Sequence, residues 1–190
     1  MHKILVVVDM QNDFITGSLG TKEAKEIIPG VANLIRDFNF NKDPVVFTRD
    51  THEVNYKDKQ EGKRLPIEHC IINTEGWHLH PDIMKVIDYI SSSILDHEVR
   101  FVNNEVYDKN TFGSLILSED LCRLYENKII DEIHFVGLCT DICVISNAVI
   151  TKAYCPEARI VIHKDLCAGT TPKAHERALE TMKGLQMDIV

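Results

Sequence analysis

Short apolar runs that end in polar residues alternate along this chain with longer segments whose apolar residues recur at helical spacing. Runs of this kind occupy residues 4–8, 44–48, 98–102, 132–136, 159–162 and 187–190. Because several are apolar on both faces, they are typical of parallel strands covered by helices on both sides. The pattern therefore predicts an α/β protein with a doubly wound, mainly parallel sheet of about six strands.

The segments between the runs predict the covering helices. Apolar residues recur every three or four positions in residues 27–39, 81–91, 115–127, 141–153 and 172–184. The last of these begins with Thr171-Pro172, a hydroxyl cap followed by proline at the first helical position, and ends near Gly184. Residues 51–80 have no strong period, and a loop of that length in a compact domain is more often functional than not.

The composition excludes several classes of protein. The chain has 190 residues, and 21 Lys and Arg against 29 Asp and Glu give a formal charge of −8, which disfavours nucleic-acid binding. Hydrophobic residues make up 44% of the chain, which is too many for a disordered segment. We expect a single domain over residues 1–190, because this length suffices for one core.

Six cysteines are the unexpected part of this composition. The first apolar run stops at Asp9, so it is too short for a signal peptide or a membrane span. We therefore expect a protein of the reducing cytoplasm with free thiols and no membrane partner, not a disulfide framework. Most of these cysteines are expected to be inert residues of the core.

Polar residues at the ends of the predicted strands are the first candidates for a site, because ligands of parallel sheets bind beyond the carboxyl ends of the strands. Asp9, Asp50, Lys109 and Cys143 all follow such runs. Cys143 would lie in the first turn of a helix capped at Thr140 or Asp141, where the helix N-terminus favours a thiolate and free N–H groups favour an oxyanion.

Simpler interpretations remain open for each of these residues. Taken alone, Cys143 fits a buried structural cysteine, Lys109 an exposed loop lysine and Asp9 a loop cap. Cys139 and Cys143 could also form a metal or redox pair, although their four-residue separation differs from the usual spacing of such pairs. The other cysteines, Cys70, Cys122, Cys155 and Cys167, lack this context and are expected to be structural.

A second group of candidates lies in the long loop. Asp50, His52, Glu61 and His69 are the mixture of imidazole and carboxylate ligands that suits a divalent transition metal. The chain has nine histidines, so two in one loop are weak evidence alone. Four neighbours compete for the same roles: His78, His80, Glu53 and Glu68.

Together these motifs resemble the isochorismatase-like cysteine hydrolase family, and within it the nicotinamidases, over nearly the whole chain. The resemblance lies in these segments: Val8-Asp9-Met10-Gln11-Asn12-Asp13-Phe14, Asp50-Thr51-His52-Glu53, Pro66-Ile67-Glu68-His69-Cys70 with Thr74-Glu75-Gly76, Asp108-Lys109 with Thr111-Phe112-Gly113-Ser114, and Gly137-Leu138-Cys139-Thr140-Asp141-Ile142-Cys143-Val144. The order and spacing of these segments carry the resemblance more than any single one.

The resemblance implies a role for each matching residue. Asp9, Lys109 and Cys143 would be the catalytic triad, and the N–H groups of Cys139 and Cys143 would form the oxyanion hole after a cis peptide at Leu138–Cys139. Asp50, His52 and His69 would bind the metal, and Glu61 would join them as in one subset of nicotinamidases. Phe14 would contact the substrate ring. Leu65 stands where an aromatic residue is frequent in the family.

The function implied is a cysteine amidohydrolase that converts nicotinamide to nicotinate and ammonia through a thioester on Cys143. The metal, with zinc favoured over iron or manganese, would position the substrate. One alternative is a related hydrolase, poor in metal, that acts on another small amide, carbamoyl compound or ureide. A second is a metal or redox module without activity. The resemblance also allows a homo-oligomer, since family members often assemble.

Overall fold

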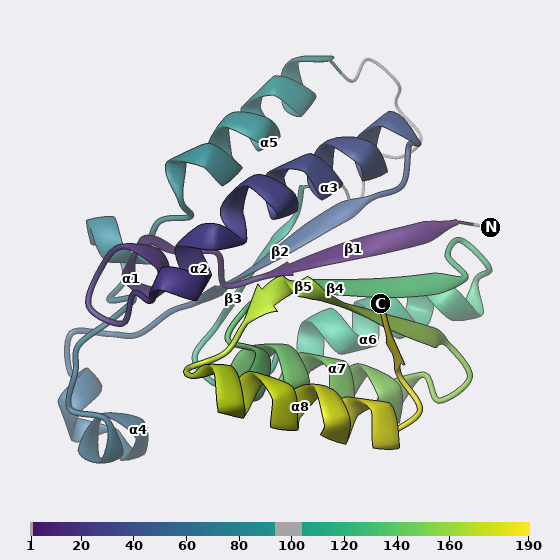
Figure 1. Cartoon of the computed structure of the whole chain (residues 1–190). Coiled ribbons are helices and arrows are strands. Elements are labelled where there is room, and N and C mark those ends of the chain that lie inside the picture. Colours follow the sequence, from purple (N-terminus) through teal and green to yellow (C-terminus); the bar gives the residue numbers. More distant parts are fainter. Residues whose placement is uncertain (1, 94–103) are drawn as a thin grey trace.

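A parallel sheet of six strands forms the middle of the molecule in this computed structural model, which describes residues 2–93 and 104–190 (Figure 1). In chain order the strands are β1 (Lys3–Val8), β2 (Val45–Asp50), β3 (Val106–Lys109), β4 (Glu132–Leu138), β5 (Arg159–Ala168) and β6 (Asp188–Ile189). They lie in the order β3-β2-β1-β4-β5-β6, and all five neighbouring pairs are parallel. The predicted doubly wound fold is therefore confirmed.

Helices cover both faces of this sheet (Figure 1). The upper layer contains α1 (Asn12–Ile15), α2 (Lys22–Glu26), α3 (Ile28–Phe40) and α5 (Pro81–Ser93). The lower layer contains α6 (Leu115–Glu126), α7 (Ile145–Tyr154) and α8 (Pro172–Gly184), with the single π-helical turn η3 (Thr140–Val144) before α7. None of the described helices is long and apolar enough to cross a bilayer.

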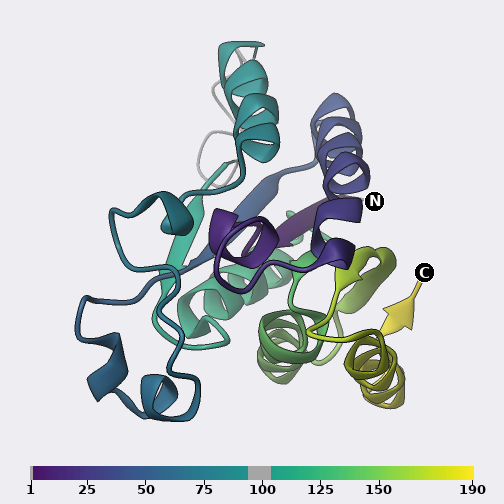
Figure 2. The same cartoon turned by 60° about the vertical axis from the view of Figure 1, so that its left-hand side comes forward.

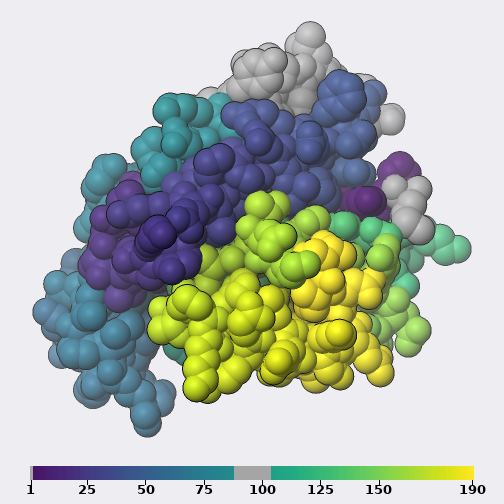
Figure 3. Space-filling view, viewed as in Figure 1, coloured from purple at the N-terminus to yellow at the C-terminus, as the bar shows by residue number. Residues whose placement is uncertain are grey.

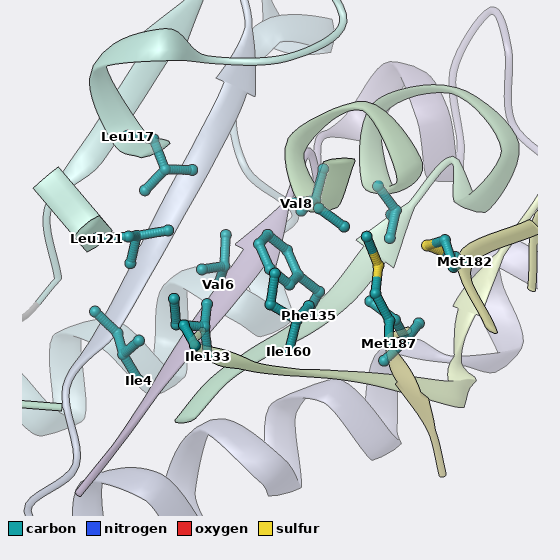
Figure 4. Packing of buried hydrophobic residues seen from close by; sticks show 14 of the residues in the cluster. Ile4, Val6, Val8, Leu117, Leu121, Ile133, Phe135, Ile160, Met182 and Met187 are labelled. Atoms are coloured by element: carbon teal, nitrogen blue, oxygen red, sulfur yellow. The ribbon is translucent and has the colours of Figure 1, made fainter. Parts of the chain in front are cut away.

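The first strand, β1, is buried on both faces, which explains why its sequence is apolar without interruption. Ile4, Val6 and Val8 pack into the lower core with α6, α7 and α8, and all three are fully buried. Leu5 and Val7 pack into the upper core with α3 and α5. Figure 4 shows the lower core, where Phe135 of β4 lies beside residues of the neighbouring strands, with Leu117 and Leu121 of α6 on one side and Met182 of α8 on the other. A two-sided core makes a period-2 pattern impossible in this strand.

Several element boundaries differ from those that the sequence predicts. The run 98–102 lies outside the described residues, and the described third strand is Val106–Lys109. Because β2 continues to Asp50, that carboxylate ends the strand and does not follow it. The predicted helix 141–153 divides into η3 and α7, and Cys139, not Thr140 or Asp141, is the residue that caps η3. The helix at 172–184 is confirmed at both ends.

The segment 51–80 covers the carboxyl ends of β1 and β2 with three short helices, η1 (Tyr56–Asp58), α4 (Gln60–Arg64) and η2 (Glu75–Trp77). Figure 2 shows these short helices beyond the strand ends, and the space-filling view shows the α4 region as a lobe at the lower left (Figure 3). The long predicted loop therefore lies where a doubly wound sheet binds its ligands.

Candidate active site

Asp9, Lys109 and Cys143 meet beyond the strand ends, as the sequence predicts. The Lys109 ammonium lies 2.7 Å from Asp9 Oδ2 and donates a hydrogen bond of 3.5 Å to Cys143 Sγ. All three side chains are buried, with Asp9 fully so. Asp9 also has a positive φ of 47°, a conformation that is sparsely populated by residues other than glycine and occurs often at functional sites.

Cys143 lies within η3, in the turn that connects β4 to α7. Gly137 lets β4 approach β1 closely before this turn, because a Cβ there would lie 2.1 Å from the Val8 carbonyl oxygen. The expected cis peptide at Leu138–Cys139 is confirmed. At the other end of the turn, Asn147 donates a hydrogen bond of 2.8 Å to the Cys143 carbonyl oxygen. A π-helical turn at this position is common at functional sites.

The burial of Cys143 favours the neutral thiol over the thiolate. Burial raises the pKa of Cys143 well above its usual value, the Asp9 charge raises it further, and Lys109 acts in the opposite direction. Burial therefore opposes the stabilisation of a thiolate that the helix start was expected to give. Burial also raises the pKa of Asp9 against the effect of Lys109, so this carboxylate is more basic than usual. A base beside a thiol can take its proton.

The second predicted group also comes together. One ligand atom from each of Asp50, His52, Glu61 and His69 lies within 4.8 Å of the others. The Nε2 atoms of His52 and His69 lie 2.9 and 3.4 Å from Asp50 Oδ2, and both lie 3.7 Å from Glu61 Oε1. Lys109 connects this cluster to the triad, since its Nζ lies 3.7 Å from Asp50 Oδ1.

The hydrogen bonds of the cluster fit a metal ion. His69 Nδ1 lies 2.9 Å from the Ile67 carbonyl oxygen and donates a hydrogen bond to it. In the neutral ring, the lone pair of Nε2 then faces the carboxylates. His52 Nε2 is buried and, although close to Asp50, makes no hydrogen bond of acceptable geometry. Burial and the charge of Asp50 raise the pKa of Glu61, whereas, against the effect of burial, the imidazoles of His52 and His69 lower the pKa of Asp50. A divalent cation between the four side chains would offset the repulsion between the two carboxylates.

The competing loop residues lie elsewhere. Glu53 and Glu68 are exposed and form ion pairs with Lys59 and Lys57. The His78 ring lies tilted against that of Trp77, and His80 lies beside Asp82 at the start of α5. Neither histidine belongs to the cluster. Spacing alone could not separate these candidates, because the fold of residues 51–80 decides which side chains face the strand ends.

Three residues that hold the site were given no role by the sequence alone. Gln11 is fully buried and bonds both the N–H and the carbonyl of Asp50, at 2.7 and 2.8 Å. The Thr48 hydroxyl donates a hydrogen bond of 2.6 Å to Asp9 Oδ1. Tyr56 packs against both metal-site imidazoles and donates to the Leu65 carbonyl. A polar residue inside a buried strand, such as Thr48, is the signal that could have indicated one of them.

A cavity of about 1210 Å³ opens over these groups. Cys143, Cys139 and the four metal-site residues contribute to its lining, whereas Asp9 and Lys109 are buried and do not. Phe14 also lines it and packs against His69, with ring centroids 5.5 Å apart. Leu65 lies on the same lining. All six cysteines are free, and Cys70, Cys122, Cys155 and Cys167 are buried in the structure without lining this cavity.

A buried Asp–Lys–Cys group beside a His and carboxylate cluster, at the carboxyl edge of a doubly wound sheet, defines an α/β protein with the parts of a cysteine hydrolase. The comparisons agree. The Isochorismatase domain family matches residues 3–89 and 91–190. An isochorismatase family protein of Bacillus subtilis, PncA, is 32% identical over 182 residues, which cover 94% of this chain and 93% of that protein. The chain belongs to the isochorismatase family.

Solved structures give the same result. The crystal structure of a nicotinamidase/pyrazinamidase from Bacillus subtilis has a TM-score of 0.81 and 30% sequence identity, covering all of both chains. A pyrazinamidase of Pyrococcus horikoshii, solved in complex with zinc, has a TM-score of 0.75 and 26% identity over 100% of this chain and 99% of that one. The family that the sequence resembles is therefore confirmed.

Proposed function

We propose that this protein is a cysteine amidohydrolase of nicotinamidase type, which converts nicotinamide and water to nicotinate and ammonia. One observation carries the proposal: a single ammonium, Lys109, contacts the base, the nucleophile and a carboxylate of the metal cluster. The nicotinamidase and pyrazinamidase names of the relatives support the substrate class.

The first half of the reaction forms a thioester. Asp9 takes the proton of the Cys143 thiol, and the thiolate attacks the carboxamide carbon. Lys109 stabilises the negative charge while it lies on sulfur, since its ammonium is held beside both groups. The backbone N–H groups of Cys139 and Cys143 stabilise the oxyanion of the tetrahedral intermediate. Asp9 then gives its proton to the departing nitrogen, which leaves as ammonia.

The second half releases the acid. Asp9, again ionised, takes a proton from water, and the hydroxide attacks the thioester carbon. The carbon–sulfur bond breaks, the Cys143 thiolate regains its proton from Asp9, and the acid product loses its own proton to solvent and leaves as the carboxylate. Asp9 therefore acts in both halves, which suits a carboxylate whose pKa burial has raised.

Asp50, His52, Glu61 and His69 would hold the metal ion, for which we propose zinc because that metal accompanies the archaeal relative. The bound metal would supply a Lewis-acidic position for the ring nitrogen of the substrate. Phe14 would pack against the ring, and the carboxamide would then face Cys143. Substrate orientation is thus shared between the metal ligands and an aromatic wall.

Replacing the nucleophile tests this mechanism. Cys143→Ala should lower kcat by at least about 10⁴-fold, because the thioester cannot form. Ammonia release from nicotinamide, with the melting temperature as a check on folding, measures the effect. Cys122→Ala is the matched control, since this buried thiol lies away from the cavity and its loss should leave ammonia release unchanged. Substantial turnover by the folded Cys143→Ala protein would refute the mechanism.

A substrate comparison tests the specificity. Leu65 lies on the cavity wall at the position where an aromatic residue is frequent in the family, so one aromatic contact to the substrate ring would be missing. Nicotinamide, pyrazinamide and an N-carbamoyl amino acid should be compared with and without a chelator. We expect the two ring amides to be hydrolysed faster, and chelation to lower their rates. Faster, chelator-insensitive hydrolysis of the carbamoyl compound would favour a carbamoyl-directed hydrolase.

A further inference from the structure

The turn that carries the nucleophile is held by a hydrogen bond from α8, which packs beside it in the lower helical layer. Thr140, which stands between Cys139 and Cys143, is fully buried, and its Oγ1 lies 2.8 Å from Nδ1 of His175. His175 belongs to α8 and does not line the large cavity. It lines a neighbouring cleft of about 290 Å³, which shares Gly169 with the large cavity.

A second contact brings the loop that precedes this helix against the turn. The Asp141 carboxylate accepts hydrogen bonds from the N–H and the hydroxyl of Thr170, at 2.8 and 2.6 Å. Gly169 makes this approach possible, because a Cβ there would lie 2.8 Å from Asp141 Oδ1 and 2.9 Å from the backbone nitrogen of His175. The loop between β5 and α8 therefore lies directly against the first two residues of the turn.

The backbone of the turn passes any shift of Thr140 to its neighbours. The Cys139 carbonyl oxygen accepts from the N–H of Ile142 at 3.0 Å and of Val144 at 3.1 Å. Cys139, Thr140 and Cys143 are thus parts of one hydrogen-bonded unit. A displacement of about 1 Å at a reacting group can cost on the order of 10²-fold in rate, so an anchor of this unit affects the reaction without contacting the substrate.

We propose that His175 is a positioning residue for the reaction at Cys143, and that it acts through the Thr140 hydroxyl on the backbone donors of Cys139 and Cys143. The inference deepens the proposed function and rests on it for the identity of the nucleophile. It assigns α8 a role in catalysis, although this helix lines no part of the cavity over Cys143.

The experiment measures the reactivity of Cys143 as well as turnover. His175→Ala, Thr140→Val and the double variant are treated with iodoacetamide, and the alkylation rate at Cys143 is followed by peptide mass spectrometry. We expect each single variant to lose about tenfold in alkylation rate and in kcat, with little change in KM. The double variant should be no slower than the slower single one, because both changes remove one interaction.

Conservative variants separate positioning from simple loss of stability. His175→Asn places an amide nitrogen near the position of Nδ1, and Thr140→Ser keeps the hydroxyl, so both should recover most of the rate. His163→Gln is the matched control, since His163 makes a hydrogen bond of the same length, 2.8 Å, to His134 away from the turn. If Thr140→Val does not fold, the His175→Ala, His175→Asn and Thr140→Ser proteins decide the question.

Two results would overturn the inference. One is an alkylation rate and kcat within twofold of the original protein in His175→Ala, with only the melting temperature lowered. The other is a double variant whose loss equals the product of the single losses. Failure of the proposed function is distinguishable, because ammonia release would then be absent from every protein while the alkylation rates still respond to His175.

Discussion

Two clusters of histidine and carboxylate lie toward opposite ends of the sheet, and they use the same residue types differently. Toward the carboxyl ends, His52 and His69 present Nε2 atoms to Asp50 and Glu61 across a cavity. Toward the amino ends, His134 Nδ1 lies 2.8 Å from His163 Nε2, and His134 Nε2 lies 3.0 Å from Glu132. The Nε2 atoms of the carboxyl-end cluster face one shared space. The ring nitrogens of the amino-end cluster are paired between His134, His163 and Glu132.

The difference shows that composition does not identify a metal site. In the amino-end cluster, the neutral rings form a chain in which His163 donates to His134 and His134 donates to Glu132. Arg159 also donates to Glu132 at 2.6 Å, so the carboxylate has its counter-charge within the protein. At the carboxyl end, the carboxylates gather around imidazoles whose free nitrogens face them. The carboxyl-end cluster therefore fits a divalent cation, whereas the amino-end cluster is paired within the protein.

The largest expected effect is on activity, which should depend on the carboxyl-end cluster and not on the amino-end cluster. His52→Ala should lose its bound metal and at least about 100-fold in kcat/KM, because substrate orientation depends on the four-residue site. His163→Gln should keep both within twofold, since Gln can still donate to His134. Metal analysis of protein purified without chelators, together with ammonia release, measures the contrast. Equal effects of the two substitutions would remove the distinction between the clusters.

The next largest effect is on the stability of the protein, to which Glu132 and Glu61 should contribute differently. Glu132→Gln should lower the free energy of unfolding by about 2 kcal/mol, and the melting temperature by about 4–8 °C, because a buried acceptor of His134 and Arg159 loses its charge. The ion pair with Arg159 contributes modestly to this loss, because the Arg159 side chain is 54% exposed and solvent screens its charge. Thermal unfolding of metal-free protein gives the measurement.

Glu61→Gln is the matched change at the other end. In metal-free protein it should cost nothing or stabilise, since it removes a negative charge near Asp50. If Glu61→Gln destabilises the metal-free protein as much as Glu132→Gln does, the carboxyl-end cluster is a structural one. If neither substitution alters stability, the amino-end cluster is not the satisfied network that its distances indicate.

The sequence alone predicts one cluster and misses the other, for a physical reason. Apolar runs followed by Asp9 and Asp50, with Lys109 beyond a third run, indicate a parallel sheet, and that topology brings residues at the strand ends together. His134 lies within a strand, where the apolar pattern predicts core, and its partner His163 belongs to another strand. Only the register that pairs His134 with Val161 brings the two histidines together.

The same limit applies within the active site. The proposed triad and the proposed metal ligands could be named from motifs, whereas the side chains that hold them could not. Thr48 and Asn147 are ordinary residues of a strand and a helix until the fold places them against Asp9 and Cys143. The choice of Glu61 over Glu53 and Glu68 depends on how η1 and α4 fold, which no local pattern specifies.

Lowering the pH should gradually reduce the stability of the folded protein through His163 of the amino-end cluster. Burial, together with the neighbouring His134 and Lys3 charges, lowers the pKa of His163 from 6.5 to about 4. Between these values the unfolded chain binds a proton that the folded protein does not, so stability falls as the pH falls from about 6.5 toward 4. After allowance for partial exposure, His163 should account for about 1 kcal/mol of the loss between pH 7 and pH 5.

Denaturant unfolding of the original protein and of His163→Gln at several pH values checks this expectation. Glu132, Arg159 and Lys3 face the same cluster and are present in both proteins, as is the carboxyl-end cluster, so the difference between the two curves isolates His163. The variant should show a shallower loss of stability with acid. Parallel curves would mean that His163 is protonated as easily in the folded protein as in the unfolded chain.

The smallest expected effect concerns the two buried carboxylates themselves. Burial raises the pKa of both, but hydrogen bonds from His134 and Arg159 lower that of Glu132 below its usual value, while that of Asp9 stays raised despite Lys109. The Thr48 hydroxyl is the neutral donor to Asp9, and a hydrogen bond to an ionised carboxylate favours the ionised form. Thr48→Val, which keeps the shape, should therefore raise the pKa of Asp9 further.

Because Asp9 must be ionised to accept the thiol proton, this substitution should move the acidic limb of the kcat/KM profile to higher pH. The shift should be less than about one pH unit, as one neutral hydrogen bond contributes about 1 kcal/mol. Thr48→Ser should return the limb to its original position. A uniform loss of rate with an unmoved limb would show that Thr48 only packs against Asp9, and that basicity at this end of the sheet depends on burial and Lys109 alone.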